Sequence, residues 1–130
     1  MARTLICVDS SVFIDYFRKQ QKQKSWLFEL TNSYDFAASV ITKLEIFSGV
    51  TDEQAAFWRQ IFQHVRLLPL EELVIDEAIR IIKILRLQNQ MIELADILIA
   101  ATAITHHLPL ATLNQKHFAR IASVTLLLPE

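Results

Sequence analysis

Short apolar runs of the length of strands alternate along this chain with longer segments whose apolar residues recur at helical spacing. Strands separated by helices favour a parallel sheet that is covered on both faces. The sequence therefore predicts an α/β fold, formed as a single domain over residues 1–130. The expected strands cover residues 5–9, 36–39, 65–68, 110–113 and 124–128. The expected helices cover residues 10–19, 22–31, 40–47, a segment opening at 52, 71–88, 93–106 and 115–120.

The spacing of apolar residues also predicts which side of each helix is buried. Ser10 or Ser11 is expected to cap the first helix. A run of small residues is expected to let the helix over 93–106 lie close to the sheet; it comprises Ala100, Ala101 and Ala103. Two further helices are expected to bury larger side chains, namely Ala56, Phe57, Ile61 and Phe62 in one and Leu73, Ala78, Ile81, Ile82 and Leu85 in the other.

The apolar content is high for a small protein, at 52% of residues with a mean hydropathy of +0.29. No apolar stretch reaches the roughly 20 residues that span a bilayer, so no membrane partner is expected. The first apolar run is too short for a signal-peptide core. The single cysteine, Cys7, fits a reducing compartment and a buried packing role. We therefore expect a cytoplasmic protein.

The chain has more apolar residues than one small core can bury. This excess predicts a homodimer or a hydrophobic partner. The candidate contact residues are Trp26, Leu27 and Leu30, or Phe57, Trp58 and Ile61. The net charge of −1 gives no overall attraction to nucleic acid. Two local basic stretches are compatible either with a surface that attracts nucleic acid or with ordinary solvated helix ends. They are Arg18, Lys19, Lys22 and Lys24, and Arg80, Lys83 and Arg86.

Four acidic or amide side chains stand where such a sheet would gather them into one pocket: Asp9, Glu45, Asp96 and Asn114. Asp9 and Asn114 end apolar strand-like runs, and ligands bind at the carboxyl ends of parallel strands where the strand order reverses. Converging carboxylates repel one another, which raises their pKa values. A hard divalent cation relieves that repulsion, so the pattern indicates a Mg²⁺ or Mn²⁺ site.

Each of these residues also has a purely structural interpretation. Asp9 and Asn114 each precede an expected helix and could cap it. Glu45 follows Thr42 by three residues, which is the spacing of a capping box. Asp96 lies in the first turn of its helix, where a negative charge interacts favourably with the helix dipole. Four unrelated caps have no reason to converge, so together the residues favour a site.

Four segments that contain these residues resemble the motifs of one nuclease family. Residues 8–15 read VDSSVFID and residues 42–49 read TKLEIFSG. Residues 95–103 read ADILIAATA and residues 110–118 read LATLNQKHF. In this order, over the whole chain, the segments resemble PIN-domain nucleases. The length is similar to that of the VapC-type toxins of bacterial toxin–antitoxin pairs.

The resemblance implies a PIN-like three-layer sandwich, with a parallel five-stranded sheet in the order 3-2-1-4-5. It implies a Mg²⁺- or Mn²⁺-dependent endoribonuclease that hydrolyses RNA and inhibits translation and growth. It also implies a homodimer and a cognate antitoxin that blocks the site. Metal binding and catalysis are carried over to Asp9, Glu45, Asp96 and Asn114, with Thr112 and Ser10 as supporting residues.

Two positions depart from the family pattern. Asn114 replaces an acid, which lowers the charge of the site. His117 stands where many relatives carry an acid, and this leaves the number of metal ions open. The sequence also assigns no role to Asp15 and does not name the target RNA.

Two other functions compete with the nuclease interpretation. In a phosphohydrolase with Asp9 as nucleophile, like the haloacid-dehalogenase-type enzymes, another aspartate usually follows two residues later, where this chain has Ser11. A catalytically weak module that binds RNA or a partner would not need its carboxylates. For the nuclease, a bound cation would activate water and polarise the phosphate, and Glu45 is the candidate to orient or deprotonate that water.

Overall fold

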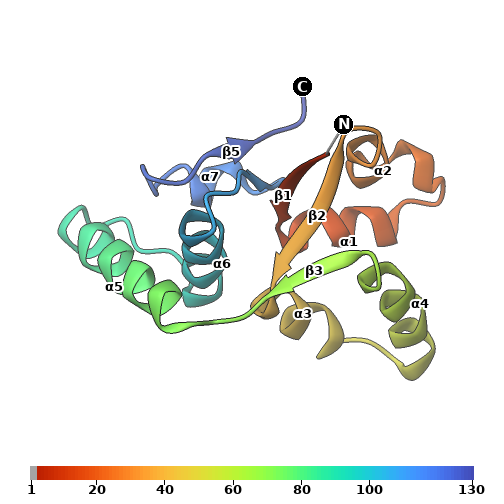
Figure 1. Cartoon of the computed structure of the whole chain (residues 1–130), viewed down its shortest axis with the longest axis horizontal. Helices are drawn as coiled ribbons and strands as arrows, with labels where there is room; N and C mark the ends of the chain where they lie inside the picture. Colours follow the sequence, from red (N-terminus) through yellow and green to blue (C-terminus); the bar gives the residue numbers. More distant parts are fainter. Residues whose placement is uncertain (1–2) are drawn as a thin grey trace.

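The protein is described by a computed structural model in which residues 3–130 are placed. Its centre is a five-stranded parallel sheet in the order β3-β2-β1-β4-β5 (Figure 1). The strands are β1 (Thr4–Val8), β2 (Tyr34–Ser39), β3 (Val65–Leu68), β4 (Leu110–Ala111) and β5 (Leu126–Leu127). The helices are α1 (Ser10–Arg18), η1 (Lys22–Lys24), α2 (Trp26–Leu30), α3 (Val40–Phe47), α4 (Asp52–Phe62), α5 (Glu72–Leu87), α6 (Leu94–Thr105) and α7 (Gln115–Phe118). The predicted fold class and strand order are confirmed.

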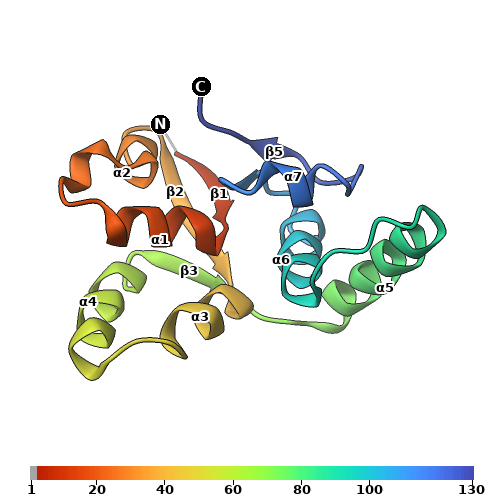
Figure 2. The same ribbon diagram turned by 180° about the vertical axis from the view of Figure 1, so that it is seen from behind.

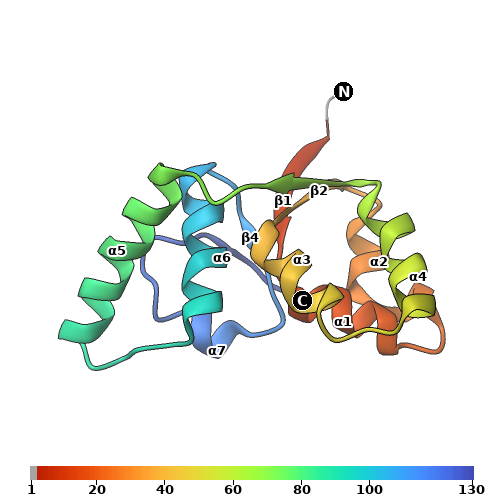
Figure 3. The same cartoon turned by 90° about the horizontal axis from the view of Figure 1, so that it is seen from below.

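Two groups of helices cover the two faces of this sheet. Helices α1, α2 and α4 lie on one side of β1, β2 and β3, and α5 and α6 lie on the other (Figures 1 and 2). Helix α3 follows β2 at the carboxyl edge of the sheet (Figure 3). The connection from β3 to β4 runs through α5 and α6, so α6 points its N-terminus toward that same edge.

The central strand β1 sends alternate side chains into two separate cores, as the period of a strand requires. Ile6 and Val8 belong to the core under α1, α2 and α4. Cys7 belongs to the core under α5 and α6. Burial raises the pKa of the Cys7 thiol to about 12, so the thiol is protonated and unreactive at neutral pH. The expected packing role of Cys7 is therefore confirmed.

Several element boundaries differ from the prediction. The expected helix over 22–31 is broken at Ser25, whose hydroxyl accepts from the backbone N–H of Phe28 and caps the short α2. Strands β4 and β5 are only two residues long, because β4 pairs with β1 and with β5 only through Leu110 and Ala111. The expectation that Ser10 or Ser11 caps α1 is wrong, since the helix already begins at Ser10.

The inward faces of two helices were assigned partly wrongly. Leu73 is 67% exposed, and its neighbour Val74 is the buried residue at the start of α5. Ala56 is exposed on α4, whereas Ala55 and Trp58 are buried there. In both helices one residue at the edge of the apolar stripe was taken for a core position. Ala100, Ala101 and Ala103 are fully buried, as predicted.

The residues proposed as a contact surface lie largely in the core. Leu27, Leu30 and Trp58 are each at most 5% exposed. The exposed large apolar side chains are found elsewhere, among them Leu44, Leu73, Leu87 and Leu94. Across residues 3–130, no helix has both the length and the apolar content to cross a membrane.

Candidate metal centre

The candidate site lies where the strand order of the sheet reverses. Strands β1 and β4 are neighbours, with Val8 opposite Ala111. The chain leaves β1 into α1 on one face and leaves β4 toward α7 on the other face. In parallel sheets, ligands bind beyond the carboxyl ends of two such strands. Asp9 and the segment from Thr112 to Asn114 are the first residues beyond the strands, so the sheet brings them together.

Asp9 is held in place by hydrogen bonds from its neighbours. Its backbone N–H donates to the carbonyl of Ala111 at 2.9 Å. Its Oδ2 accepts hydrogen bonds from the hydroxyls of Ser11 at 2.7 Å and Thr112 at 2.9 Å. Within residues 3–130 no donor reaches Oδ1. The side chain is only 4% exposed, so a nearly buried carboxylate has one oxygen fixed and one oxygen free.

Thr112 and Ser11 connect this carboxylate to the loop after β4. Thr112 Oγ1 accepts from the backbone N–H of Asn114 at 2.9 Å, and Ser11 Oγ accepts from the N–H of Leu113 at 3.0 Å. Each hydroxyl thus donates to Asp9 and accepts from a backbone N–H of the loop after β4. Ser11 was not predicted as a site residue. A hydroxyl two residues after a strand-ending aspartate is the sequence signal that could have identified it, because such side chains bond locally.

Glu45 reaches the site from α3 and is oriented by Ser10. The Ser10 hydroxyl donates to Glu45 Oε1 at 2.6 Å. Ser10 is buried, whereas Glu45 is exposed. The contact joins the first residue of α1 to the carboxylate of another helix and leaves Oε2 free to accept a further bond. Ser10, expected as a supporting residue, therefore lies beside the carboxylate of Glu45.

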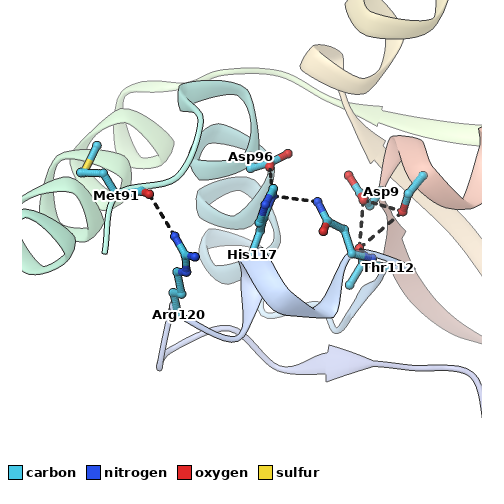
Figure 4. Close-up of polar contacts among 8 residues, drawn as sticks. Asp9, Met91, Asp96, Thr112, His117 and Arg120 are labelled. Atoms are coloured by element: carbon cyan, nitrogen blue, oxygen red, sulfur yellow. Dashed lines mark hydrogen bonds and ion pairs between the residues drawn. The ribbon is translucent and has the colours of Figure 1, made fainter. Parts of the chain in front are cut away.

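Asp96, His117 and Asn114 form a second group of polar contacts, in which Asp96 and His117 point toward one another (Figure 4). The Asn114 amide nitrogen donates to His117 Nδ1 at 2.9 Å, which leaves the amide oxygen free. The same ring nitrogen lies 3.4 Å from Asp96 Oδ2. Asp96 projects from the first turn of α6, as predicted. The His117 ring therefore separates the carboxylate of α6 from the amide that follows β4.

The carboxylates influence one another electrostatically. Burial raises the pKa of Asp96, the negative charges of Asp9 and Glu45 raise it further, and His117 opposes the shift. The charges of Asp9, Glu45 and His117 thus act on the carboxyl group of Asp96, and the three acidic residues stay a predicted site. Asp15 does not join them, because it pairs with Lys19 at 3.4 Å on α1.

The capping interpretations do not account for these side chains. Asp9 and Asn114 occupy N-cap positions, but neither side chain accepts a capping hydrogen bond from a backbone N–H of its helix. Glu45 is not part of a capping box, because α3 begins at Val40 and is capped by Ser39. Only Asp96 retains a favourable place near a helix N-terminus. The carboxylates of Asp9 and Glu45 are therefore free of backbone-capping roles.

The donor set suits a hard divalent cation. The free oxygens belong to carboxylates and a side-chain amide, which are the ligands that Mg²⁺ and Mn²⁺ prefer. A cation would also remove the repulsion that raises the pKa of Asp96. In residues 3–130, however, no group of three or more His, Cys, Asp or Glu side chains is drawn together closely enough to hold a metal ion. The residues fit the ion chemically, and ion binding would have to draw them closer.

Fold and site together define a class: an α/β protein with an acidic centre at the switch point of a parallel sheet. A model of the PIN-domain family matches residues 6–124. The chain belongs to the PIN-domain family. It is 35% identical over 117 residues to Ribonuclease VapC1 of Methanocaldococcus jannaschii, covering 89% of this chain and 80% of that protein. It is 35% identical over 115 residues to Ribonuclease VapC10 of Mycobacterium tuberculosis, covering 88% and 86%.

Solved structures of similar shape agree with this assignment. A toxin–antitoxin complex from Klebsiella pneumoniae contains a chain with a TM-score of 0.73 and 27% identity, covering 92% of this chain and 95% of that one. VapBC2 from Rickettsia felis, bound to a DNA fragment from its promoter, gives a TM-score of 0.82 at 18% identity, covering 98% and 100%. The second likeness shows the fold alone. The predicted resemblance to VapC-type proteins is confirmed by these comparisons.

Proposed function

We propose that residues 1–130 form a single nuclease domain, a divalent-metal-dependent endoribonuclease that is the toxin of a toxin–antitoxin pair. The observation that carries this proposal is that side chains from separate elements meet beyond β1 and β4: Asp9 accepts from Thr112, Glu45 accepts from Ser10, and Asp96 lies 3.4 Å from His117. Two relatives are named as ribonucleases, Ribonuclease VapC1 and Ribonuclease VapC10, which supports RNA as the substrate. The solved toxin–antitoxin complex from Klebsiella pneumoniae supports the pairing with an antitoxin.

Asp9, Asp96 and Asn114 are the residues that would hold the cation, with Glu45 nearby. A bound Mg²⁺ or Mn²⁺ supplies charge neutralisation for the phosphodiester and lowers the pKa of a water. Ser11 and Thr112 fix the Asp9 carboxylate. The Asn114 amide nitrogen donates to the His117 ring, so the Asn114 amide oxygen is available as a metal ligand. These contacts orient the first set of ligands before the substrate arrives.

Glu45 is the residue proposed to position the attacking water. Its Oε1 is held by Ser10 and its Oε2 is free to accept a proton. The water oxygen forms a bond to phosphorus as the bond from phosphorus to the 3′ oxygen breaks. Glu45 receives a proton from the water, and the departing 3′ oxygen takes up a proton from solvent. The products are a 5′ phosphate and a 3′ hydroxyl.

A nuclease assay with a matched variant tests the proposal. A panel of structured RNAs should be cleaved in Mn²⁺ or Mg²⁺, and chelation with EDTA should stop cleavage. Asp9→Asn should abolish it. Asp76→Asn, which removes an exposed carboxylate on α5, should cleave normally. Cleavage that persists in Asp9→Asn would contradict the proposed site. RNA binding without any cleavage would favour the module that only binds.

The cognate antitoxin is proposed to inhibit by placing a cationic side chain among the carboxylates. An arginine guanidinium pairs with carboxylates through two parallel hydrogen bonds and substitutes for the charge of the metal. Changing that arginine of the partner to alanine should restore nuclease activity. Tight binding that leaves cleavage unaffected would instead locate the antitoxin at a remote surface.

A homodimer is proposed as well, because large apolar side chains such as Leu44, Leu87 and Leu94 remain exposed. Light scattering at micromolar concentration tests this. A clean monomer without any partner would contradict it.

A further inference from the structure

A pocket lies between α5 and the segment that follows α7. Its volume is about 90 Å³. Its lining combines apolar side chains of α5 with polar groups of both segments, which are here called the rim residues. The rim residues are Arg80, Gln88, Arg120 and Ser123. None of these residues belongs to the carboxylate cluster, so the pocket is a separate feature of the surface.

Arg120 ties this pocket to the site. It follows His117 by three residues, and its backbone N–H donates to the carbonyl of His117 at 3.3 Å. Figure 4 shows Arg120 next to His117, on the side away from Asp9. The guanidinium is held in place by a hydrogen bond from Nη1 to the carbonyl of Met91 at 3.1 Å. A row of polar groups therefore continues from Asp9 through His117 to Arg120.

The two arginines of the pocket differ in how their charge is used. Arg80 forms a salt bridge with Glu77, and its Nη2 donates to the hydroxyl of Ser123 at 2.6 Å. Its charge is therefore offset inside the protein. Arg120 has no acidic partner within residues 3–130, and only one of its five N–H donors is engaged. A half-buried guanidinium with free donors is well suited to an anion.

We propose that Arg120 and the pocket beside it bind a backbone phosphate of the RNA, next to the phosphate that is cleaved. This deepens the proposed function and rests on it. A guanidinium presents paired donors that match two oxygens of a phosphate. A cation at the carboxylates and the guanidinium of Arg120 would then bind neighbouring phosphates of one RNA strand. Arg120 binds substrate in this proposal and takes no part in the bond-breaking step.

RNA binding without cleavage tests this directly. The probe is a fluorescein-labelled single-stranded RNA of mixed sequence, titrated by anisotropy against the Asp96→Asn chain in Mg²⁺ at several salt concentrations. Adding Arg120→Gln should weaken binding about tenfold, since a hydrogen bond to a charged group is lost. The slope of log affinity against log salt should fall by about 0.7, the value for one phosphate contact on a single strand.

Two further variants separate charge from structure. Arg120→Lys keeps the positive charge and should keep most of the salt slope. Arg59→Gln removes an exposed arginine from α4, on the opposite side of the sheet, and should change neither affinity nor slope. In the active chain, Arg120→Gln should raise KM with little change in kcat.

The outcomes are distinguishable. Equal effects of Arg120→Gln and Arg59→Gln would overturn the phosphate site and leave the nuclease proposal standing. The same would follow if Arg120→Lys lost as much of the salt slope as Arg120→Gln, because the effect would then come from the lost contact with Met91. Failure of the chain to bind or cleave any RNA would overturn both proposals.

Discussion

The two cores of the molecule are built from different side chains. The aromatic half, under α1, α2 and α4, is filled by rings, with Phe13 and Phe62 at 5.2 Å and Phe17 and Trp58 at 5.5 Å between centroids. The aliphatic half, under α5 and α6, is filled by alanine, valine, isoleucine and leucine, with Phe118 as the single ring among its buried described residues. Large rings hold helices away from the sheet, whereas alanines let α6 approach it closely.

The candidate site lies on the seam between these halves. Ser10 and Glu45 come from α1 and α3, which pack with the aromatic half. Asp96 comes from α6 in the aliphatic half. The distances among the carboxylates thus depend on how each half positions its helices. The geometry of the site therefore depends on the packing of both halves, and variants in each half can test the two contributions one at a time.

The largest expected effect is on the stability of the aromatic half. Trp58 is 2% exposed and contacts the rings of Phe13, Phe17 and Phe62. Trp58→Ala removes this packing and should lower the free energy of unfolding by about 3–5 kcal/mol in urea denaturation. Leu87→Ala, at a side chain that is 89% exposed, should change it by less than about 0.5 kcal/mol. Similar values for both would mean that the rings do not form the main core of that half.

Asp96→Asn should separate activity from stability at the seam. Cleavage should fall by about 100-fold or more, because a proposed metal ligand is lost. The melting temperature without metal should hold or rise, because burial and the charges of Asp9 and Glu45 disfavour the ionised carboxylate.

The pH dependence of that difference has a definite sign. A raised pKa in the folded state means that ionisation of Asp96 costs stability at neutral pH, and that the cost disappears as pH falls through the raised pKa. The advantage of Asp96→Asn in melting temperature should therefore shrink on acidification. A large loss of stability without metal at neutral pH would make Asp96 a structural residue.

Ala100→Leu tests the close approach of α6 in the aliphatic half. Ala100 is fully buried, and the added side chain should lower the free energy of unfolding by about 1–3 kcal/mol through overpacking. Cleavage should fall as well, because α6 carries Asp96. The same substitution at the exposed Ala56 of α4 should leave both quantities nearly unchanged. If Ala100→Leu also proved neutral in calorimetry, the small-residue face would not be tightly packed.

Ser10→Ala should have the smallest effect. The hydroxyl donates to Glu45 at 2.6 Å, and its loss frees the carboxylate to adopt other orientations. We expect roughly a tenfold decrease in kcat, in line with the loss of a group that orients a site residue. Ser33→Ala, at an exposed serine before β2, should be unchanged. Equal rates for the two variants would remove Ser10 from the site.

The sequence predicted the order of elements well because each signal is local. Strand-length apolar runs and helical apolar periods identified the parallel α/β fold, and the motif resemblance supplied the strand order. The errors came where two local signals compete. Ser25 caps α2 and interrupts what reads as one helix, and Leu73 lies at the edge of an apolar stripe whose centre is Val74. Surface and core positions of similar hydropathy cannot be told apart until the neighbouring helix is in place.

The sequence by itself determined which side chains are available for chemistry and at which strand and helix ends they stand. Only the tertiary structure decided what those side chains touch. Ser11 shares the Asp9 carboxylate with Thr112 because β1 and β4 are neighbours, although about a hundred residues separate them in the chain. His117 lies between Asp96 and Asn114 because α6 packs beside α7. Such contacts arise from long-range pairing and packing, which no local pattern encodes.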